Sequence, residues 1–202
     1  MNTPSQPGKV IFLNGPTSSG KTSLAKALQD KLPEPYLHIG IDRLIGMMPE
    51  HLNNWTGDLN NTDGFSFTQE KDSSGHLISQ LQIGPYADKI CDLLRTLAIT
   101  MLNQGFNLII DEVCLRKNSF ENWQKILAPY STFYIGVQAF LDILESREKQ
   151  RGDRILGSAR SQNVLVHQDN LYDLMLDTSD ASIAQCAELV LKNLSLFQMK
   201  TP

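Results

Sequence analysis

The chain has 202 residues, of which 41% are hydrophobic and 20% are charged, a balance typical of a globular domain rather than a disordered chain. Its 18 Lys and Arg residues against 22 Asp and Glu residues give a net charge of −4. The chain therefore has no basic surplus with which to hold a nucleic acid by its phosphates.

Cysteine usage and hydropathy bear on the compartment. The three cysteines, Cys91, Cys114 and Cys186, are odd in number and widely spaced, which favours reduced thiols. No apolar run approaches the roughly 18 residues of a membrane span. The N-terminal segment "MNTPSQPGK" lacks the apolar core of a signal peptide. These features predict a cytoplasmic protein with no membrane or nucleic-acid partner.

Segments with strand and helix patterns alternate along the chain. Short apolar runs predict strands at residues 9–13, 36–41, 107–113, 132–139 and 172–178. Helical periodicity predicts helices at 23–32, 85–103, 120–127, 140–150 and 182–196. This alternation favours right-handed crossovers and a parallel sheet with helices on both faces. We therefore predict an α/β fold in one domain over residues 1–202.

Two segments interrupt the alternation. Residues 50–82 are rich in Asn, Asp, Gly, Ser and Thr, which predicts a hairpin or a mobile excursion. Residues 147–160, "REKQRGDRILGSAR", concentrate four arginines and two glycines. Long connections in compact domains are often functional, although a solvated loop remains the alternative for each segment.

The first predicted strand runs directly into a glycine-rich segment. "GPTSSGKT", from Gly15 to Thr22, fits the Walker A pattern GxxxxGK[ST] and stands between a strand and a helix. Backbone N–H groups of such a loop converge on a phosphate, and the helix N-terminus adds partial positive charge. Lys21 is expected to reach the β and γ phosphates, and the Thr22 hydroxyl to hold Mg²⁺. The predicted nucleotide-binding residues of the loop are Gly15, Pro16, Thr17, Ser18, Ser19, Gly20, Lys21, Thr22 and Ser23.

A Mg²⁺-bound nucleotide also needs a carboxylate near the loop. In "NLIIDEVCL" the third predicted strand ends in Asp111 and Glu112, which is the Walker B pattern. We assign Asp111 to the magnesium site, with Thr22 as the second metal residue. An acidic residue at a strand end could instead cap the next helix.

The chain carries no NKxD motif, which argues against a GTPase. Arg147, Arg151 and Arg154 follow at spacings of four and three, so on a continued helix they would point one way, with Gly152 as a hinge. Guanidinium groups on a closing lid neutralise charge on a transferring phosphoryl group. The alternative is a surface helix whose arginines pair with the acidic neighbours Glu145, Glu148 and Asp153.

A kinase also needs a group that deprotonates the acceptor hydroxyl. The second predicted strand leads into Asp42, at the sheet edge where open α/β folds bind ligands. A carboxylate there can accept the hydroxyl proton during transfer. Asp42 could instead cap a helix starting at Arg43.

In their order and spacing, these motifs resemble the chloramphenicol phosphotransferase-like family from about Val10 to Leu191. The resemblance rests on the Walker A segment together with "LPEPYLHIGIDRLIGMMP", "IGPYADKI", "LIIDEVCL", "SREKQRGDRILGSARSQ" and "VHQDNLYDLMLDTS". It implies a three-layer α/β/α P-loop kinase core with a five-stranded parallel sheet and an Arg-rich lid at 147–160. It also implies ATP- and Mg²⁺-dependent transfer to a hydroxyl of a small molecule.

Residue by residue, the resemblance implies that Asp42 is the base, that Lys21 and Thr22 bind phosphate and magnesium, and that Asp111 completes the metal site. Arg147, Arg151 and Arg154 would clamp the phosphates, with Asp177 and Thr178 near the adenine. The polar 50–82 segment looks longer than the family pattern, which puts chloramphenicol itself in doubt as the acceptor. A hydrolase in which Glu112 orients water, and a nucleotide-sensing module with a protein partner, are the rival hypotheses. The apolar C-terminal helix could serve the core or a homo-oligomer interface.

Overall fold

A five-stranded parallel sheet forms the centre of the protein. The computed structural model describes residues 6–55, 63–152 and 155–200. The sheet has the strand order β2-β5-β1-β6-β7, and every neighbouring pair is parallel, which confirms the predicted α/β fold class. Its strands are β1 (Val10–Asn14), β2 (Tyr36–Gly40), β5 (Asn107–Glu112), β6 (Thr132–Gln138) and β7 (Leu174–Asp177). Each lies within two residues of a predicted strand at both ends.

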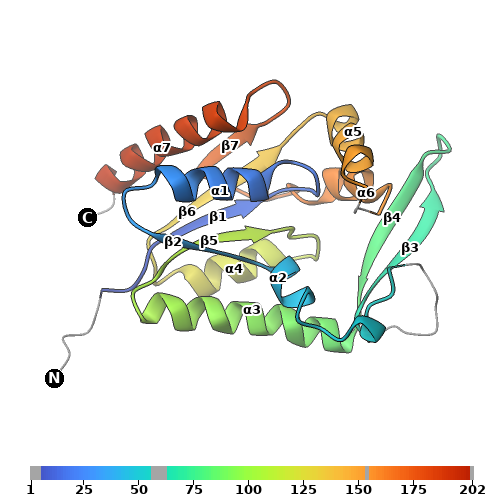
Figure 1. Cartoon of the computed structure of the whole chain (residues 1–202), viewed down its shortest axis with the longest axis horizontal. Helices are drawn as coiled ribbons and strands as arrows, with labels where there is room; N and C mark the ends of the chain where they lie inside the picture. Colours follow the sequence, from blue (N-terminus) through green and yellow to red (C-terminus); the bar gives the residue numbers. More distant parts are fainter. Residues whose placement is uncertain (1–5, 56–62, 153–154, 201–202) are drawn as a thin grey trace.

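Helices cover both faces of this sheet (Figure 1). On one face α1 (Lys21–Lys31) and α7 (Ile183–Lys200) pack over a cluster that includes Leu13, Leu28 and Val190. On the other face α3 (Pro85–Asn103) and α4 (Ser119–Leu127) enclose a cluster that includes Phe12 and Trp123. The central strand β1 is buried along its whole length, which explains its continuously apolar sequence.

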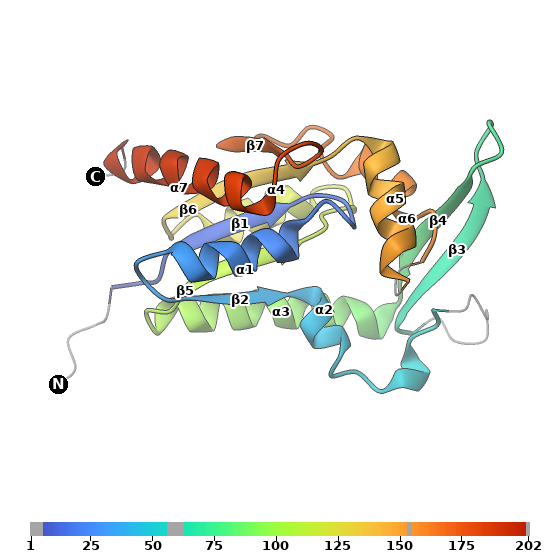
Figure 2. The ribbon, with the colours of Figure 1, turned by 45° about the horizontal axis from the view of Figure 1, so that its top comes forward.

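The excursion predicted at 50–82 contains a hairpin that stands outside the sheet. A short helix α2 (Ile41–Ile45) follows β2, and a 3-10 turn at Glu50–Leu52 comes next. Strands β3 (Phe65–Lys71) and β4 (Leu77–Ile83) then pair antiparallel. Figure 2 shows this hairpin extending from one end of the molecule, beyond the carboxyl edge of the parallel sheet.

The predicted lid is built from two helices. Helix α5 (Leu141–Arg151) ends at Gly152, which adopts the left-handed conformation with φ 67°. Helix α5 lies within one residue of the predicted helix at 140–150, and it does not continue past Gly152, the condition under which the three arginines would point one way. Arg154 itself lies outside the described residues. Helix α6 (Ser158–Leu165) was not predicted, because "SARSQNVL" has too few apolar residues to show a helical period.

The N-terminus of helix α6 is stabilised by a side chain of helix α5. The buried Glu148 carboxylate of α5 accepts hydrogen bonds from the backbone N–H of Gly157 and of Ala159, both at 2.8 Å. These amides belong to the first turn of α6, whose N–H groups have no partner within the helix. The alternative that Glu148 lies on a surface helix and pairs with its arginines is therefore wrong, because its side chain is buried. No helix of the described part of the chain is long and apolar enough to cross a membrane.

Candidate active site

The glycine-rich segment forms a tight loop between β1 and α1. A Cβ on Gly15 would lie 2.1 Å from the Val137 carbonyl oxygen of the neighbouring strand, so only glycine fits at that position. Gly20 has φ 91° at the N-terminus of α1, a left-handed conformation that glycine adopts without strain. Ser18 also has a positive φ of 63°. Such loops turn backbone N–H groups inward.

Lys21 lies across this loop rather than in solvent. Its side chain is buried, and Nζ donates to the carbonyl oxygens of Gly15 at 2.8 Å and of Pro16 at 2.9 Å. The hydroxyl oxygens of Ser18 and Ser19 are buried with no hydrogen-bond partner among the described residues. Unpartnered buried hydroxyl groups beside a lysine and a helix N-terminus suit an anionic guest.

Thr178, the residue that follows β7, contacts the glycine-rich loop and supports it. Thr178 is fully buried, and its Oγ1 lies 2.9 Å from the carbonyl oxygen of Ser19. Arg147 of α5 donates to Thr178 Oγ1 at 3.0 Å and to the Thr178 carbonyl oxygen at 2.6 Å. It also reaches the Ser18 carbonyl oxygen at 3.5 Å. Arg147 and Thr178 therefore hold the loop through side-chain contacts.

Asp177, the neighbour of Thr178, is exposed at the end of the same strand. Hydrogen bonds from Ser179 are the main cause that lowers the pKa of its carboxyl, and Gln138 and Arg147 add to them. The expected proximity of Asp177 and Thr178 to adenine stays a prediction.

The two residues assigned to magnesium touch one another. Thr22 Oγ1 donates to Asp111 Oδ2 at 2.7 Å, and His38 Nε2 of β2 lies 3.4 Å from the same oxygen. Burial acts to raise the pKa of Asp111, but the His38 hydrogen bond, the Lys21 charge and the Thr22 hydrogen bond outweigh it and lower the pKa. An ionised carboxylate beside a hydroxyl is the hard oxygen donor set that Mg²⁺ prefers.

Asp111 is not a helix cap, because the next helix, α4, begins eight residues later after Asn118. The alternative role of this carboxylate as an N-cap is therefore wrong. The adjacent Glu112 differs from it in environment. Burial, followed by the charge of Asp111, raises the pKa of Glu112 to about 7, and its Oε1 has no hydrogen-bond partner among the described residues.

Asp42 lies in the first turn of α2, immediately after β2. The N-cap of α2 is Gly40 rather than Asp42, so the capping alternative for this carboxylate is wrong. Asp42 instead lines a cavity of about 760 Å³ that is also lined by Lys21, Thr22 and Asp111. The structure thus brings the predicted base, the loop and the metal pair to one cavity.

The far end of this cavity is apolar. The hairpin contributes two cross-strand pairs, Phe65 opposite Ile83 and Phe67 opposite Leu81. Trp55 stacks on Phe65 with ring centroids 6.4 Å apart and also contacts Phe67. Polar residues of the same strands, such as Ser66 and Gln82, alternate with these and point to the opposite face. Composition alone hid this apolar face, because polar residues outnumber apolar ones in the segment.

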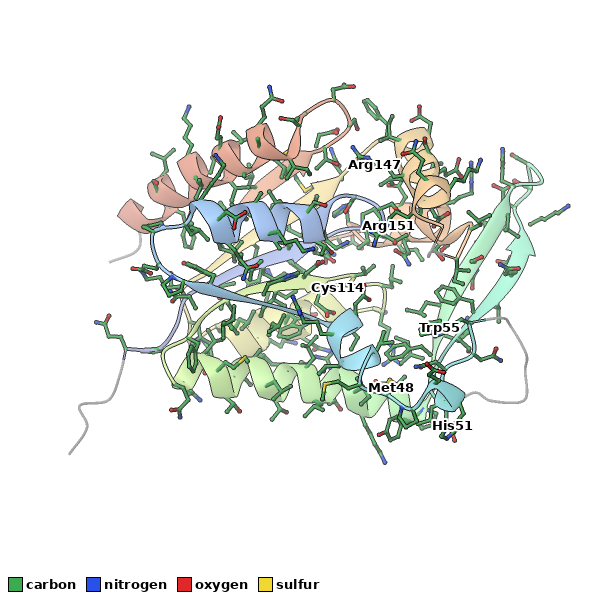
Figure 3. All side chains as sticks on the ribbon, viewed as in Figure 1. Met48, His51, Trp55, Cys114, Arg147 and Arg151 are labelled. Carbon is green, nitrogen blue, oxygen red and sulfur yellow. The ribbon has the colours of Figure 1, made fainter. Side chains whose placement is uncertain are left out.

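The lid arginines differ in their surroundings. Figure 3 shows Arg147 and Arg151 on α5, near the loop that precedes α1. Arg151 lines the cavity, and its role in clamping the phosphates stays a prediction. Of the proposed surface pairs, Glu145 does form one, but with Arg160 of α6, at 2.7 Å.

Three contributors to the cavity were not predicted. His38 lies one strand away from Asp111, and the register that pairs Gly40 with Asp111 sets its position. Gln162 of α6 accepts a hydrogen bond from the Thr17 backbone N–H at 2.7 Å. Arg95 of α3 lines the cavity beside Trp123, with its guanidinium 5.8 Å from that ring centroid. No local motif marks these residues, because contacts distant in sequence bring them to the site.

Comparison with known proteins agrees with this geometry. The family model described as chloramphenicol phosphotransferase-like protein matches residues 8–195. A protein of Mycobacterium tuberculosis that carries the name O-phosphotransferase is 30% identical over 183 residues, which cover 89% of this chain and 79% of that protein.

Solved structures with a similar fold include two kinases. The APS kinase CysC of M. tuberculosis, solved with AMPPNP and APS, superimposes with a TM-score of 0.64 at 17% identity over 94% of this chain and 98% of that chain. A gluconokinase from Sinorhizobium meliloti gives a TM-score of 0.59 at 16% identity over 97% and 99% of the two chains. With its nucleotide-binding loop and its family match taken together, the chain is a P-loop phosphotransferase that belongs to the chloramphenicol phosphotransferase-like family.

Proposed function

We propose that the protein transfers the γ-phosphoryl group of Mg²⁺-bound ATP to a hydroxyl group of a small molecule in the cytoplasm. The observation that carries the proposal is a single cavity with a phosphate-binding loop at one end, an apolar wall at the other, and Asp42 on its lining. A hydrolase has no need of a second, differently lined end.

In this proposal the nucleotide is bound by the glycine-rich loop and by the two residues assigned to magnesium, Thr22 and Asp111. Lys21 exchanges its contacts with the Gly15 and Pro16 carbonyl oxygens for the β and γ phosphates. Thr22 and Asp111 hold Mg²⁺, which neutralises phosphate charge and orients the nucleotide. Arg151 acts on the transferring group from the cavity side, and Asp177 and Thr178 lie at the adenine end. Arg154 keeps its proposed clamping role from the sequence.

Asp42 accepts the proton of the acceptor hydroxyl as the oxygen attacks phosphorus. A loose phosphoryl transition state asks for little covalent help, so positioning and charge neutralisation supply most of the rate enhancement. The ionised carboxylate of Asp111 stays with the metal, and Asp42 alone serves the hydroxyl. Asp111 and Asp42 therefore have different tasks in the reaction.

The lining of the cavity indicates the kind of acceptor. The four apolar residues of the hairpin and Trp55 suit a flat or apolar portion, while Arg95 and Glu112 offer polar contacts elsewhere on the lining. We infer an acceptor with a hydroxyl group close to an apolar or aromatic portion. The apolar wall suits a compound such as chloramphenicol better than the polar composition of residues 50–82 suggested, and we count this compound as one candidate among hydroxylated antibiotics.

A ligand screen followed by a transfer assay tests the proposal. Hydroxylated antibiotics and metabolites are screened by thermal shift with Mg²⁺ and a non-hydrolysable ATP analogue, since a ligand that binds only the folded state raises its apparent stability. Each hit is then incubated with Mg²⁺ and ATP, and phosphorylated acceptor is measured by mass spectrometry. ATP hydrolysis that needs no acceptor and disappears in Glu112→Gln would instead support the hydrolase.

A further inference from the structure

The hairpin that walls the acceptor end is bonded to a lid helix as well as to the cavity. One face of the hairpin carries, in succession, the pairs Phe65–Ile83, Phe67–Leu81 and Gln69–Ser79. The first two pairs line the cavity, and the third meets the segment that begins α6. The views in Figure 1 and Figure 2 agree that α6 lies beside β4.

The contact at Ser79 is dense and buried. Ser79 Oγ donates to the Leu156 carbonyl oxygen at 2.6 Å, and the Ser79 N–H donates to the Gly157 carbonyl oxygen at 3.1 Å. Ser161 Oγ lies 2.6 Å from the Ser79 carbonyl oxygen. Ser79 is fully buried, although β4 is otherwise largely open to solvent. Strand β4 and the segment that begins α6 therefore share a specific hydrogen-bonded contact.

Glycine at position 157 makes this approach possible. A Cβ there would lie 2.6 Å from the Leu77 carbonyl oxygen and 3.1 Å from the Ser79 nitrogen, and the residue has φ 87°. At the edge of the same contact, Arg160 bridges Glu145 of α5 and Asp72 of the hairpin turn, at 2.7 Å and 3.5 Å. The hairpin and α6 are therefore joined along their contact.

The same helix touches the phosphate-binding loop. Gln162 is buried one turn after Ser158, and its Oε1 accepts the Thr17 N–H at 2.7 Å. The chain of contacts thus runs from the acceptor wall through Ser79, along α6, to Thr17 of the loop. A two-stranded hairpin is marginal by itself, so its order depends on what it is bonded to.

We propose that α6 couples the acceptor-side hairpin to the phosphate-binding loop, with Ser79 and Gln162 as positioning residues at its two ends. The inference rests on the proposed binding of a nucleotide by the loop. A nucleotide that fixes the loop fixes Gln162 and α6, and α6 in turn orders the hairpin. The acceptor wall is then ordered once ATP has bound. Without bound ATP, an ordered acceptor site is disfavoured.

Hydrogen exchange on the full chain tests the coupling, with Mg²⁺ and a non-hydrolysable ATP analogue as the probe. In the wild-type protein we expect peptides of β3 and β4 to exchange at least about threefold more slowly when the analogue is bound, together with loop peptides 15–23. Two variants weaken the path: Gln162→Leu removes the bond to Thr17 at the loop end, and Ser79→Ala with Ser161→Ala removes the two hydroxyl bonds at the hairpin end. Both should retain protection of the loop while losing protection of the hairpin.

Thr68→Ala is the matched control, because Thr68 lies on the opposite, exposed face of the hairpin, where its hydroxyl accepts a hydrogen bond from Gln82. It should behave as the wild-type protein. A protected loop beside an unchanged hairpin in the wild-type protein would overturn the coupling. Hairpin protection that survives in Gln162→Leu would overturn the assigned path. Failure of the analogue to protect the loop itself would instead refute nucleotide binding, and the coupling with it.

Discussion

The two ends of the cavity are built in different ways. The phosphate end comes from eight consecutive residues, Gly15 to Thr22, set between a fully buried strand and the first turn of α1. The acceptor end comes from residues spread between Ile41 and Ile83, on a short helix and a hairpin outside the sheet. One end is part of the core, whereas hydrogen bonds to α6 hold the other.

This difference separates the general from the specific part of the reaction. Phosphate chemistry is common to all P-loop kinases and resides where the core fixes the backbone. In our proposal, acceptor recognition resides on the hairpin, which stands outside the parallel sheet. Function on a shared fold lives in such sites rather than in the fold itself. A variant of Asp42, a variant that acts on the phosphate end and a variant that acts on the acceptor end test this division.

The largest effect is expected from Asp42→Asn, because Asp42 is proposed to take the acceptor proton. Loss of a general base lowers the turnover number by about 10²- to 10⁴-fold. The affinity for a non-hydrolysable ATP analogue, measured by calorimetry, should stay within about twofold, since the change removes a transition-state interaction only. Asp30→Asn, at an exposed position on α1, is the control. Unchanged turnover in Asp42→Asn would reject the proposed base.

A change at His38 should weaken the phosphate end through the metal site. His38→Phe removes the contact between Nε2 and Asp111 but keeps a ring of similar size. Loss of a partner that orients a metal ligand typically lowers metal affinity by about 10- to 100-fold. The Mg²⁺ concentration for half-maximal transfer should rise accordingly, with the acceptor KM unaffected. His38→Gln, which retains a donor, should recover part of the loss, and equal defects in both variants would contradict this role.

Phe67→Ala should act on the acceptor end alone. It truncates one aromatic residue of the apolar wall, and a lost apolar contact changes discrimination by about 1–3 kcal/mol, or about 10- to 200-fold. Steady-state kinetics should show a raised acceptor KM with an unchanged KM for ATP. Thr68→Ala, on the opposite face of the same strand, should leave both constants alone. A raised KM for ATP in Phe67→Ala would argue against the division of the cavity.

The smallest effect concerns Glu112 and stability rather than turnover. Its pKa is raised from 4.5 to about 7 by burial and by Asp111, so the folded state holds a proton that the unfolded chain has lost. Between these values the free energy of unfolding should fall as pH rises, by on the order of 1–3 kcal/mol. Glu112→Gln should flatten this dependence in metal-free buffer, as measured by chemical denaturation from pH 5 to 7.5. Glu121→Gln, on the exposed face of α4, should not.

Much of the fold was predictable because local patterns agree with it. Helix α3 begins and ends at the predicted residues, since Pro85 starts it and Gly105 follows its last turn. The central strand precedes a Walker A loop, whose glycine spacing has a local cause. Helix α6 was missed because its first turn depends on Glu148, nine residues before Gly157 and on another helix. No periodicity within α6 records that contact.

The candidate site divides along the same line. The sequence by itself determined the phosphate loop and the family, because contiguous residues form the loop and their spacing is its geometry. It also indicated Asp42 and Asp111 as acids at strand ends. Tertiary structure alone decided that His38 contacts Asp111, that an apolar hairpin face closes the acceptor end, and that α6 joins this face to the loop. These contacts follow from strand register and from the packing of elements distant in the chain, which local sequence does not encode.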